Sequence, residues 1–309
     1  MRNSVGVSLY NMKFDKPPLS FEAQADLLLS RGLIADKQIL INRLTVVNYY
    51  RLSTYLYPFR TPDNKFQSGT TLDLIWRRYT FDRQLRLLVM DAIERFEVSV
   101  RTKLAYHFSH EYGPFAYFEP TYLPKLPISG FAQWIIEFSR EIQRSKEPFI
   151  IHFDQKHGEL HDLPPLWMAV EVMSFGKVLT MYRGIGSKLK QKISSYYGLS
   201  DEIFLSWFLT LNSVRNICAH HGRIFDRRFD YQPKIPRLQK YPEWHVPVKI
   251  SRDRVFGILT ILNYILQFDA PTSFWKVRLE KLFTDYADIS KEVMGIPENW
   301  NESPLWKNK

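Results

Sequence analysis

The sequence predicts an all-α protein, a helical bundle that carries additional helices at its N-terminus. Apolar residues recur at intervals of three and four through most of the 309-residue chain, which is the period of an amphipathic helix. No run of alternating β-branched residues lies between Gly-Asn or Gly-Asp turns, so strand signals are weak. Hydrophobic residues make up 45% of the chain and aromatic residues 15%, which supplies a sizeable core and excludes a mostly disordered protein.

The first two helices follow from their caps and periodicity. One helix begins at Phe21, with Ser20 as its N-cap, and Gly32 ends it. A second helix is predicted over 36–50, because Ile39, Leu40, Leu44 and Val47 fall on one of its sides.

The longest periodic stretch covers residues 71–110, without an internal Gly or Pro. Two helices and one long bent helix both remain open for it. Just before this stretch, the turn residues of 61–64 make a small hairpin over 59–70 conceivable.

Prolines and polar segments divide the rest of the chain. Residues 149–165 are polar and are predicted as a loop, and four prolines make 232–247 an irregular surface loop. Six further helices are predicted, over 130–144, 166–182, 187–197, 200–220, 252–268 and 273–290.

The chain is expected to form three regions. Residues 1–70 are an N-terminal helical region packed on the core, 71–295 are the helical core, and 296–309 are a loosely ordered tail.

Composition points to a soluble cytoplasmic protein. The single cysteine, Cys218, excludes an intramolecular disulfide and fits a reducing compartment. The start of the chain has no apolar stretch of signal-peptide length. The apolar run 256–268 is too short to span a membrane, and Asn263 and Gln267 interrupt it. No membrane partner is therefore expected.

Positive charge is concentrated in one part of the sequence. The formal net charge is +10, and residues 183–254 hold fourteen basic and six acidic side chains, so +8 of it lies in less than a quarter of the chain. Aromatic residues are interspersed there, including Tyr196, Tyr197 and Phe225. Basic groups beside aromatic rings suit a single-stranded nucleic acid. A solvated basic face over core aromatics is the alternative.

One motif within this region suits phosphodiester cleavage. Arg215 and His220 are separated by four residues, and Asn216 and His221 lie beside them. An arginine holds a phosphate through its planar fork, and a histidine can take and return a proton near neutral pH. No metal and no other cofactor is required where RNA supplies its 2′-hydroxyl as nucleophile.

The spacing of this motif raises a geometric problem. Positions five apart on a regular helix lie roughly 140° from each other, so one continuous helix does not place Arg215 beside His220. Either the helix distorts near 220–222, or the residues meet those of a second subunit. Gly222 is predicted as the C-cap, which places both histidines in the last turn.

Arg215-Asn216 with His220 resembles the Arg-X4-His signature of HEPN ribonucleases. From about residue 16 to about 286, the chain also resembles bacterial Abi proteins of the AbiD/AbiF type, which are abortive-infection phage-defence proteins. The ordered blocks that carry this second resemblance are Gln24 with Leu28, Arg31 to Leu33, Asn48 to Leu52 with Tyr55 and Pro58-Phe59, Phe81 to Arg83 with Leu85-Arg86, Glu97 to Arg101, Pro164 to Trp167, Ser174 to Gly176, and Val214 to His221.

These resemblances imply a HEPN-type helical bundle and a metal-independent endoribonuclease toxin that leaves a 2′,3′-cyclic phosphate. They also imply a homodimer whose Arg and His line one cleft, and a small RNA antitoxin as a partner beside the RNA substrate. The predicted catalytic residues are Arg215, His220 and Asn216, with His221 as an auxiliary. The alternative is a non-catalytic RNA-binding or adaptor protein of the same fold, held in complex with a small RNA.

For each of the remaining candidate residues, a structural role is the simpler alternative to a functional one. Glu97 and Arg101 form an i,i+4 ion pair, or one of them has an auxiliary role: Glu97 orients Arg215, or Arg101 contacts RNA. The histidines of 152–161 are expected to belong to a polar loop and to hold no metal. Cys218 is expected to be a packed helix residue rather than a nucleophile. Five residues are predicted to bind the RNA backbone: Lys188, Lys190, Arg223, Arg227 and Arg228.

Overall fold

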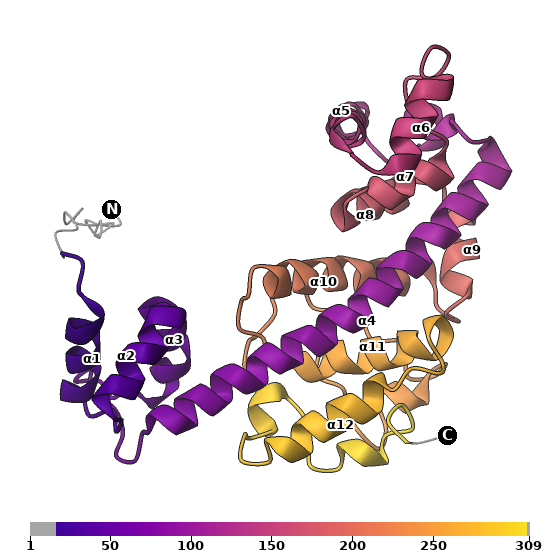
Figure 1. The fold of residues 1–309 in the computed structure, drawn as a ribbon. Helices are drawn as coiled ribbons and strands as arrows, with labels where there is room; N and C mark the ends of the chain where they lie inside the picture. Colours follow the sequence, from indigo (N-terminus) through magenta and orange to yellow (C-terminus); the bar gives the residue numbers. More distant parts are fainter. Residues whose placement is uncertain (1–16, 308–309) are drawn as a thin grey trace, which may run out of the picture. The chain divides into compact units, whose positions relative to one another are not determined.

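The computed structural model describes residues 17–307, which form α-helices and short 3-10 helices joined by loops (Figure 1). No β-strand forms among these residues, which confirms the predicted all-α class. Residues 1–16 of the predicted N-terminal region and 308–309 of the predicted tail lie outside the described residues. Two compact units divide the chain between Thr80 and Phe81.

The first unit packs three short helices and the start of a long one. Its helices are α1 (Phe21–Ser30), α2 (Lys37–Val46), α3 (Tyr49–Leu56) and the first residues of α4 (Leu72–Tyr112). Ser20 caps α1 as predicted, because its hydroxyl oxygen accepts the Ala23 N–H at 3.2 Å. Gly32 follows α1 with a positive φ of 95°, which glycine adopts readily.

Two predictions for the first unit are wrong. The helix predicted over 36–50 is broken after Val46, because the Asn48 side chain accepts the Tyr50 N–H and starts α3 as its N-cap. The hairpin considered over 59–70 reduces to one isolated bridge between Arg60 and Phe66. The long stretch, by contrast, is one helix, α4.

The second unit contains the rest of α4 and eight further helices. Figure 1 shows α4, α10, α11 and α12 lying side by side within it. The helices are α5 (Ile128–Arg144), α6 (Pro148–His157), α7 (Leu166–Val172), α8 (Phe175–Gly184), α9 (Ser187–Ser195), α10 (Asp201–Ala219), α11 (Val255–Asp269) and α12 (Trp275–Asp285).

Aromatic side chains join the central helices of the second unit. Phe96 of α4 lies 5.7 and 5.5 Å, ring centre to ring centre, from Phe204 and Phe208 of α10. Trp207 of α10 in turn contacts Tyr264 of α11 at 5.6 Å. These edge-to-face contacts fix α10 against both neighbours along its buried side.

Three helix predictions for the second unit need correction. The predicted helix 166–182 is two helices, because Ser174 has extended backbone and starts α8 as its N-cap, with its carbonyl accepting the N–H groups of Lys177 and Val178. The predicted loop 149–165 contains α6, which buries Ile150 and Phe153. The last predicted helix is shorter and ends at Asp285.

The C-terminal segment up to residue 307 is not a loose tail. Trp306 is only 3% exposed, its indole N–H donates to the Thr260 hydroxyl at 3.0 Å, and its ring stacks on Phe256. The Asn263 amide donates to the Leu305 carbonyl oxygen at 2.8 Å. The Trp306 ring, packed against α11, therefore orders C-terminal residues that the sequence suggested would be loosely held.

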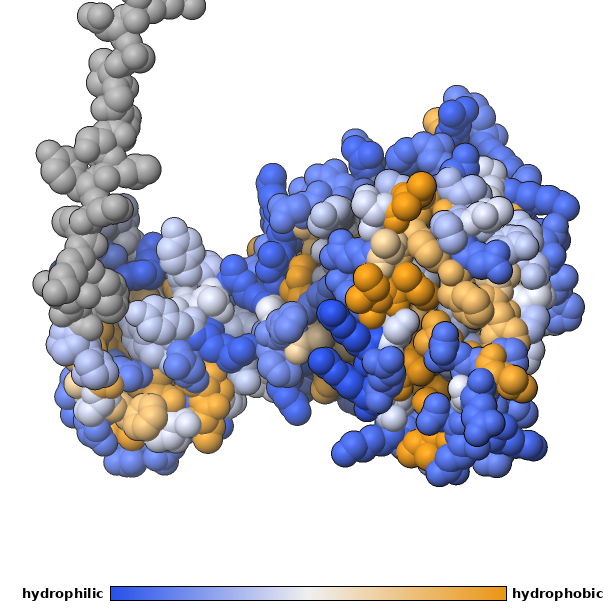
Figure 2. Space-filling view, turned by 90° about the horizontal axis from the view of Figure 1, so that it is seen from above, coloured by the Kyte–Doolittle hydropathy of each residue, from blue (hydrophilic) through white to orange (hydrophobic). Residues whose placement is uncertain are grey.

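The surface of the larger unit is mixed in character. Figure 2 shows a band of hydrophobic residues among hydrophilic ones on one of its faces. Across residues 17–307, none of the helices has the length and hydropathy needed to cross a membrane.

Candidate active site

Helix α10 carries the predicted motif at its C-terminal end. The helix begins at the N-cap Ser200, whose hydroxyl accepts the Ile203 N–H at 3.4 Å. The other end leaves Arg215 partly exposed and Asn216 exposed. Its buried side follows the predicted spacing of three and four: Phe204, Trp207, Phe208, Leu211, Val214 and Cys218.

The chain turns sharply where α10 ends. The His221 N–H donates to the Cys218 carbonyl at 2.9 Å, and the Gly222 N–H donates to the Ile217 carbonyl at 2.8 Å. These two bonds form a Schellman motif, which satisfies carbonyls at the helix end. His221 occupies the left-handed position of this motif, with a φ of 58°. A left-handed residue that is not glycine costs about 1–3 kcal/mol, and such residues concentrate at functional sites.

The prediction that Gly222 is the C-cap is wrong by two residues. His220 is the C-cap, and His221 takes the conformation that usually requires glycine, so both histidines lie beyond the last helical turn. A glycine is still needed at position 222, but for lack of space rather than for its backbone conformation. A Cβ atom there would lie 2.8 Å from Cγ2 and 3.1 Å from the carbonyl oxygen of Ile217.

A buried ion pair on α4 holds the segment that follows the motif. The Asp82 carboxylate is fully buried and accepts the N–H groups of Ile224 at 3.0 Å and Phe225 at 2.9 Å. It also pairs with Arg86, whose guanidinium approaches the Gly222 carbonyl oxygen at 3.5 Å. The pair therefore fixes the backbone that leaves the histidines.

Asp82 and Arg86 are the residues that the sequence reasoning missed as part of the site. The signal was present, because an Asp and an Arg four apart lie between Phe81, Leu85 and other apolar positions of the same helix face. Charged residues at buried positions are rare unless they are paired.

The loop after the motif is anchored by buried aromatic rings. Phe225 contacts Phe81 at 5.9 Å in an edge-to-face arrangement, and Phe229 is also buried. The Arg254 guanidinium donates to the Asp226 carbonyl oxygen at 2.9 Å. These contacts hold the loop that carries three of the predicted RNA-binding residues.

The two catalytic candidates do not meet within one chain. Helix α10 stays regular through Ala219, so the helix does not distort to bring Arg215 to His220. Within residues 17–307, no hydrogen bond joins these two side chains. Arg215 instead donates to the Asn216 amide oxygen at 3.4 Å, and His220 and His221 are exposed. The turn at 220–222 that the sequence allowed is present, but it does not join the two side chains by a hydrogen bond within residues 17–307.

Cys218 lies buried within the motif and its thiol is unreactive. Burial raises the pKa of its thiol to about 12, the nearby Arg86 charge opposes this effect, and the Asp82 charge adds to it. A thiol with this pKa stays protonated near neutral pH, and the thiolate is the reactive form. The residue therefore packs, as expected from the sequence.

Glu97 and Arg101 pair with each other rather than with the motif. Their side chains form an i,i+4 ion pair on α4 and are 16% and 11% exposed. The Arg101 guanidinium also donates to the carbonyl oxygens of Val170 at 2.5 Å and Glu171 at 3.2 Å. Arg101 thus holds the C-terminal end of α7, so no contact supports an auxiliary role of the pair at Arg215.

Three of the five predicted RNA-binding residues lie directly after the motif. Arg227 and Arg228 are exposed, and Arg228 lies 3.9 Å from Asp253. Arg223 pairs with Asp226 at 2.9 Å. These residues can present positive charge beside the end of α10.

The other two predicted RNA-binding residues lie elsewhere on α9. Lys190 is buried, its ammonium donates to the Arg183 carbonyl oxygen at 2.8 Å, and burial lowers its pKa. This correction removes Lys190 from any phosphate contact. Lys188 is exposed and pairs with Glu111 at 3.2 Å. Glu111 is 29 residues beyond Asp82 on α4, which is about 43 Å at 1.5 Å per residue, so Lys188 is remote from the motif.

The histidines of the polar segment pack on aromatic rings. His161 stacks on Phe115 at 4.3 Å, and His157 lies 5.3 Å from Phe153. No group of three His, Cys, Asp or Glu side chains within residues 17–307 is arranged to hold a metal ion.

Comparison with known protein families gives one match. The family model described as Abi-like protein matches residues 42–226, which include α4, α10 and the whole motif. A search of curated proteins and a search of solved structures each returned no match.

Proposed function

We propose that this chain, which belongs to the Abi-like protein family and so to abortive-infection defence, acts in that defence as an endoribonuclease toxin of HEPN type. The observation that carries the proposal is the end of α10. A partly exposed Arg and an exposed Asn lie one turn before two exposed histidines, on a backbone that a buried ion pair holds. A rigid support of this kind is what an active site needs to keep its groups in place.

The proposed reaction needs only these side chains and the RNA itself. The 2′-hydroxyl oxygen attacks the adjacent phosphorus while His220 of one chain takes its proton. The bond from phosphorus to the 5′-oxygen breaks, and that oxygen takes a proton from solvent and leaves as a 5′-hydroxyl, while His220 returns its proton to solvent. The other product is a 2′,3′-cyclic phosphate, and no water or metal ion is consumed. Arg215 neutralises the charge on the phosphate oxygens, and Asn216 positions the phosphate by a hydrogen bond.

A homodimer completes the proposed site. Because positions five apart on a helix lie roughly 140° from each other, we infer that a two-fold partner sets Arg215 of one chain beside His220 of the other. Both side chains are free to do so, since Arg215 is partly exposed and His220 is exposed. Arg223, Arg227 and Arg228 would hold the RNA backbone next to the cleft.

A non-catalytic role is the second candidate. The separation of Arg215 from His220 favours it, because a protein that only binds RNA needs no contact between them. Such a protein would hold a small RNA on the basic loop after α10 and cleave nothing.

A matched pair of double variants tests the proposal. Arg215→Ala/His220→Ala should abolish toxicity on expression in cells and leave cellular RNA ends unchanged. Arg140→Ala/His152→Ala removes an exposed Arg and an exposed His from α5 and α6 and should be as toxic as the parent. If the Arg215/His220 variant remains fully toxic with the same RNA ends, the nuclease proposal fails. RNA binding by the parent without any cleavage would establish the adaptor.

A further inference from the structure

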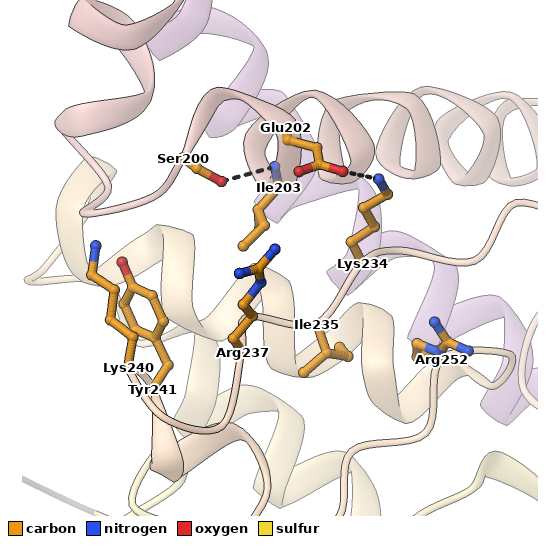
Figure 3. Close-up of a pocket in the computed structure, with 9 residues that line it drawn as sticks. All are labelled: Ser200, Glu202, Ile203, Lys234, Ile235, Arg237, Lys240, Tyr241 and Arg252. Carbon is orange, nitrogen blue, oxygen red and sulfur yellow. Dashed lines mark hydrogen bonds and ion pairs between the residues drawn. The ribbon is translucent and has the colours of Figure 1, made fainter.

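A basic cavity lies at the opposite end of α10 from the motif. It has a volume of about 440 Å³ and opens between the start of α10 and the irregular loop 232–247 (Figure 3). None of its residues was predicted as a site residue. It is lined by Ser200, Glu202, Ile203, Lys234, Ile235, Arg237, Lys240, Tyr241 and Arg252.

Positive charge dominates this cavity. Four of the lining side chains are basic and one, Glu202, is acidic. The Lys234 ammonium donates a hydrogen bond to the Glu202 carboxylate. This bond is the largest cause of the lowered pKa of Glu202, and the charges of Lys234 and Arg237 lower it further. In the part of the chain that the structure describes, the charged groups of Arg237, Lys240 and Arg252 make no hydrogen bond or ion pair.

Four cations share this cavity with one carboxylate, so its net positive charge is unfavourable. A bound anion would offset this charge, and the planar fork of an arginine matches the oxygens of a phosphate group. Figure 3 shows the Arg237 guanidinium directed towards Ile203 and Glu202, with Arg252 and Lys240 on either side of it. Arg237 and Lys240 therefore reach the cavity from the loop 232–247, and Arg252 lines it from the segment before α11.

The remaining walls are apolar. Ile203 and Ile235 line the cavity together with Tyr241, whose hydroxyl donates to the Gly198 carbonyl oxygen and so fixes the ring. A cavity with both cations and apolar walls suits a ligand that joins an anionic group to a planar organic part. Its volume lies within the range of about 300–1,000 Å³ that small-molecule sites occupy.

We propose that this cavity binds a nucleoside monophosphate, either free or as the 5′-phosphorylated end of an RNA strand. It is a separate site from the motif, because Glu202 and Arg215 are 13 residues apart on α10, about 20 Å along the helix. The proposal does not depend on RNA cleavage, since binding there needs neither Arg215 nor His220.

Calorimetric titration of the full chain tests this proposal. The Arg215→Ala/His220→Ala background keeps RNA probes intact and separates this test from that of the nuclease. The probes are AMP, adenosine, inorganic phosphate, and two RNA oligonucleotides of one sequence with a 5′-phosphate or a 5′-hydroxyl. AMP should bind at one site per chain, and more tightly than adenosine or phosphate. A preference for the 5′-phosphorylated oligonucleotide over both AMP and the 5′-hydroxyl form would assign the RNA end, and a preference for AMP would assign the free nucleotide.

Substitutions at exposed positions locate the binding. Arg237→Ala/Arg252→Ala should weaken AMP binding by about tenfold or more, because each lost charged hydrogen bond weakens binding markedly. Arg140→Ala/Arg144→Ala removes the same charge from exposed positions of α5 and should leave binding unchanged. Glu202→Gln should strengthen binding, since it removes the one negative charge. Equal binding of adenosine and AMP, or unchanged binding in Arg237→Ala/Arg252→Ala, would overturn the proposal.

Discussion

Substitution of Asp82 by alanine should destabilise the second unit strongly. The carboxylate is fully buried and the Arg86 side chain with which it pairs is 7% exposed. Removing one member of a buried pair leaves an uncompensated charge and costs about 3–5 kcal/mol. The N–H groups of Ile224 and Phe225 also lose their acceptor, at about 1–3 kcal/mol for each buried group. These losses share one carboxylate and do not add fully, so we expect about 4 kcal/mol.

Asp91→Ala is the matched control on the same helix. Asp91 also pairs with an arginine four residues later, Arg95, at 3.2 Å, and with Arg278 of α12, but its side chain is 28% exposed. Exposed pairs of this kind contribute about 0–1 kcal/mol each. Asp82→Ala/Arg86→Met should recover part of the loss, because it removes the uncompensated guanidinium, although the N–H groups of Ile224 and Phe225 still lack their acceptor.

Urea unfolding measures these differences. Trp207, Trp244 and Trp275 are buried in the second unit, so their fluorescence reports its unfolding. Amide hydrogen exchange adds a local reading, since the amides of residues 224 and 225 should lose protection in Asp82→Ala and keep it in Asp91→Ala. An Asp82→Ala variant within about 1 kcal/mol of Asp91→Ala would refute the role assigned to the buried pair.

Three further predictions concern single residues. Gly222→Ala should destabilise the protein by about 1–3 kcal/mol, because its Cβ clashes with Ile217 of the preceding helix. Gly130→Ala on α5, where a Cβ has ordinary contacts, should stabilise it by about 0.5–1 kcal/mol. Urea unfolding measures both changes in the free energy of unfolding. Stability should fall as pH rises above about 9, because the unfolded Cys218 thiol ionises there while the folded thiol keeps its proton to about 12; Cys218→Ala should remove this part of the pH dependence. Lys190→Met should leave RNA affinity unchanged, whereas Arg227→Ala should weaken binding to all RNA sequences. Arg227→Ala should also reduce the slope of log affinity against log salt concentration by about 1.

Much of the helical architecture could be predicted from the sequence. The three-and-four spacing located α4, α10 and α11, and Ser20 and Ser200 were readable as the starts of their helices. The breaks inside predicted helices were less visible, because they depend on side chains that compete locally with the helix, such as Asn48. Periodicity does not record that competition.

The site could be predicted only in part. The motif of Arg215, Asn216 and His220 lies at the end of α10, as its sequence predicted, and its spacing of five, roughly 140° on a helix, predicted that one helix does not unite the pair. The buried Asp82–Arg86 pair left a signal in the sequence, but its contact with the segment after the motif could not be predicted, because the partners of Asp82 there are backbone N–H groups about 140 residues away. Lys190 was misassigned for a related reason, since the net charge of a segment does not show which lysine packs inward.

The chemistry of the cleaved ends tests the central claim most directly. The purified protein is incubated with single-stranded RNA in the presence of EDTA, and the fragments are identified by mass spectrometry. We predict fragments with 2′,3′-cyclic phosphate and 5′-hydroxyl ends, no cut where the nucleotide before the scissile phosphate is 2′-deoxy, and no fragments with Arg215→Ala/His220→Ala. Cleavage of the 2′-deoxy substrate, a requirement for metal ions, or 3′-hydroxyl ends would contradict the proposed attack by the 2′-hydroxyl.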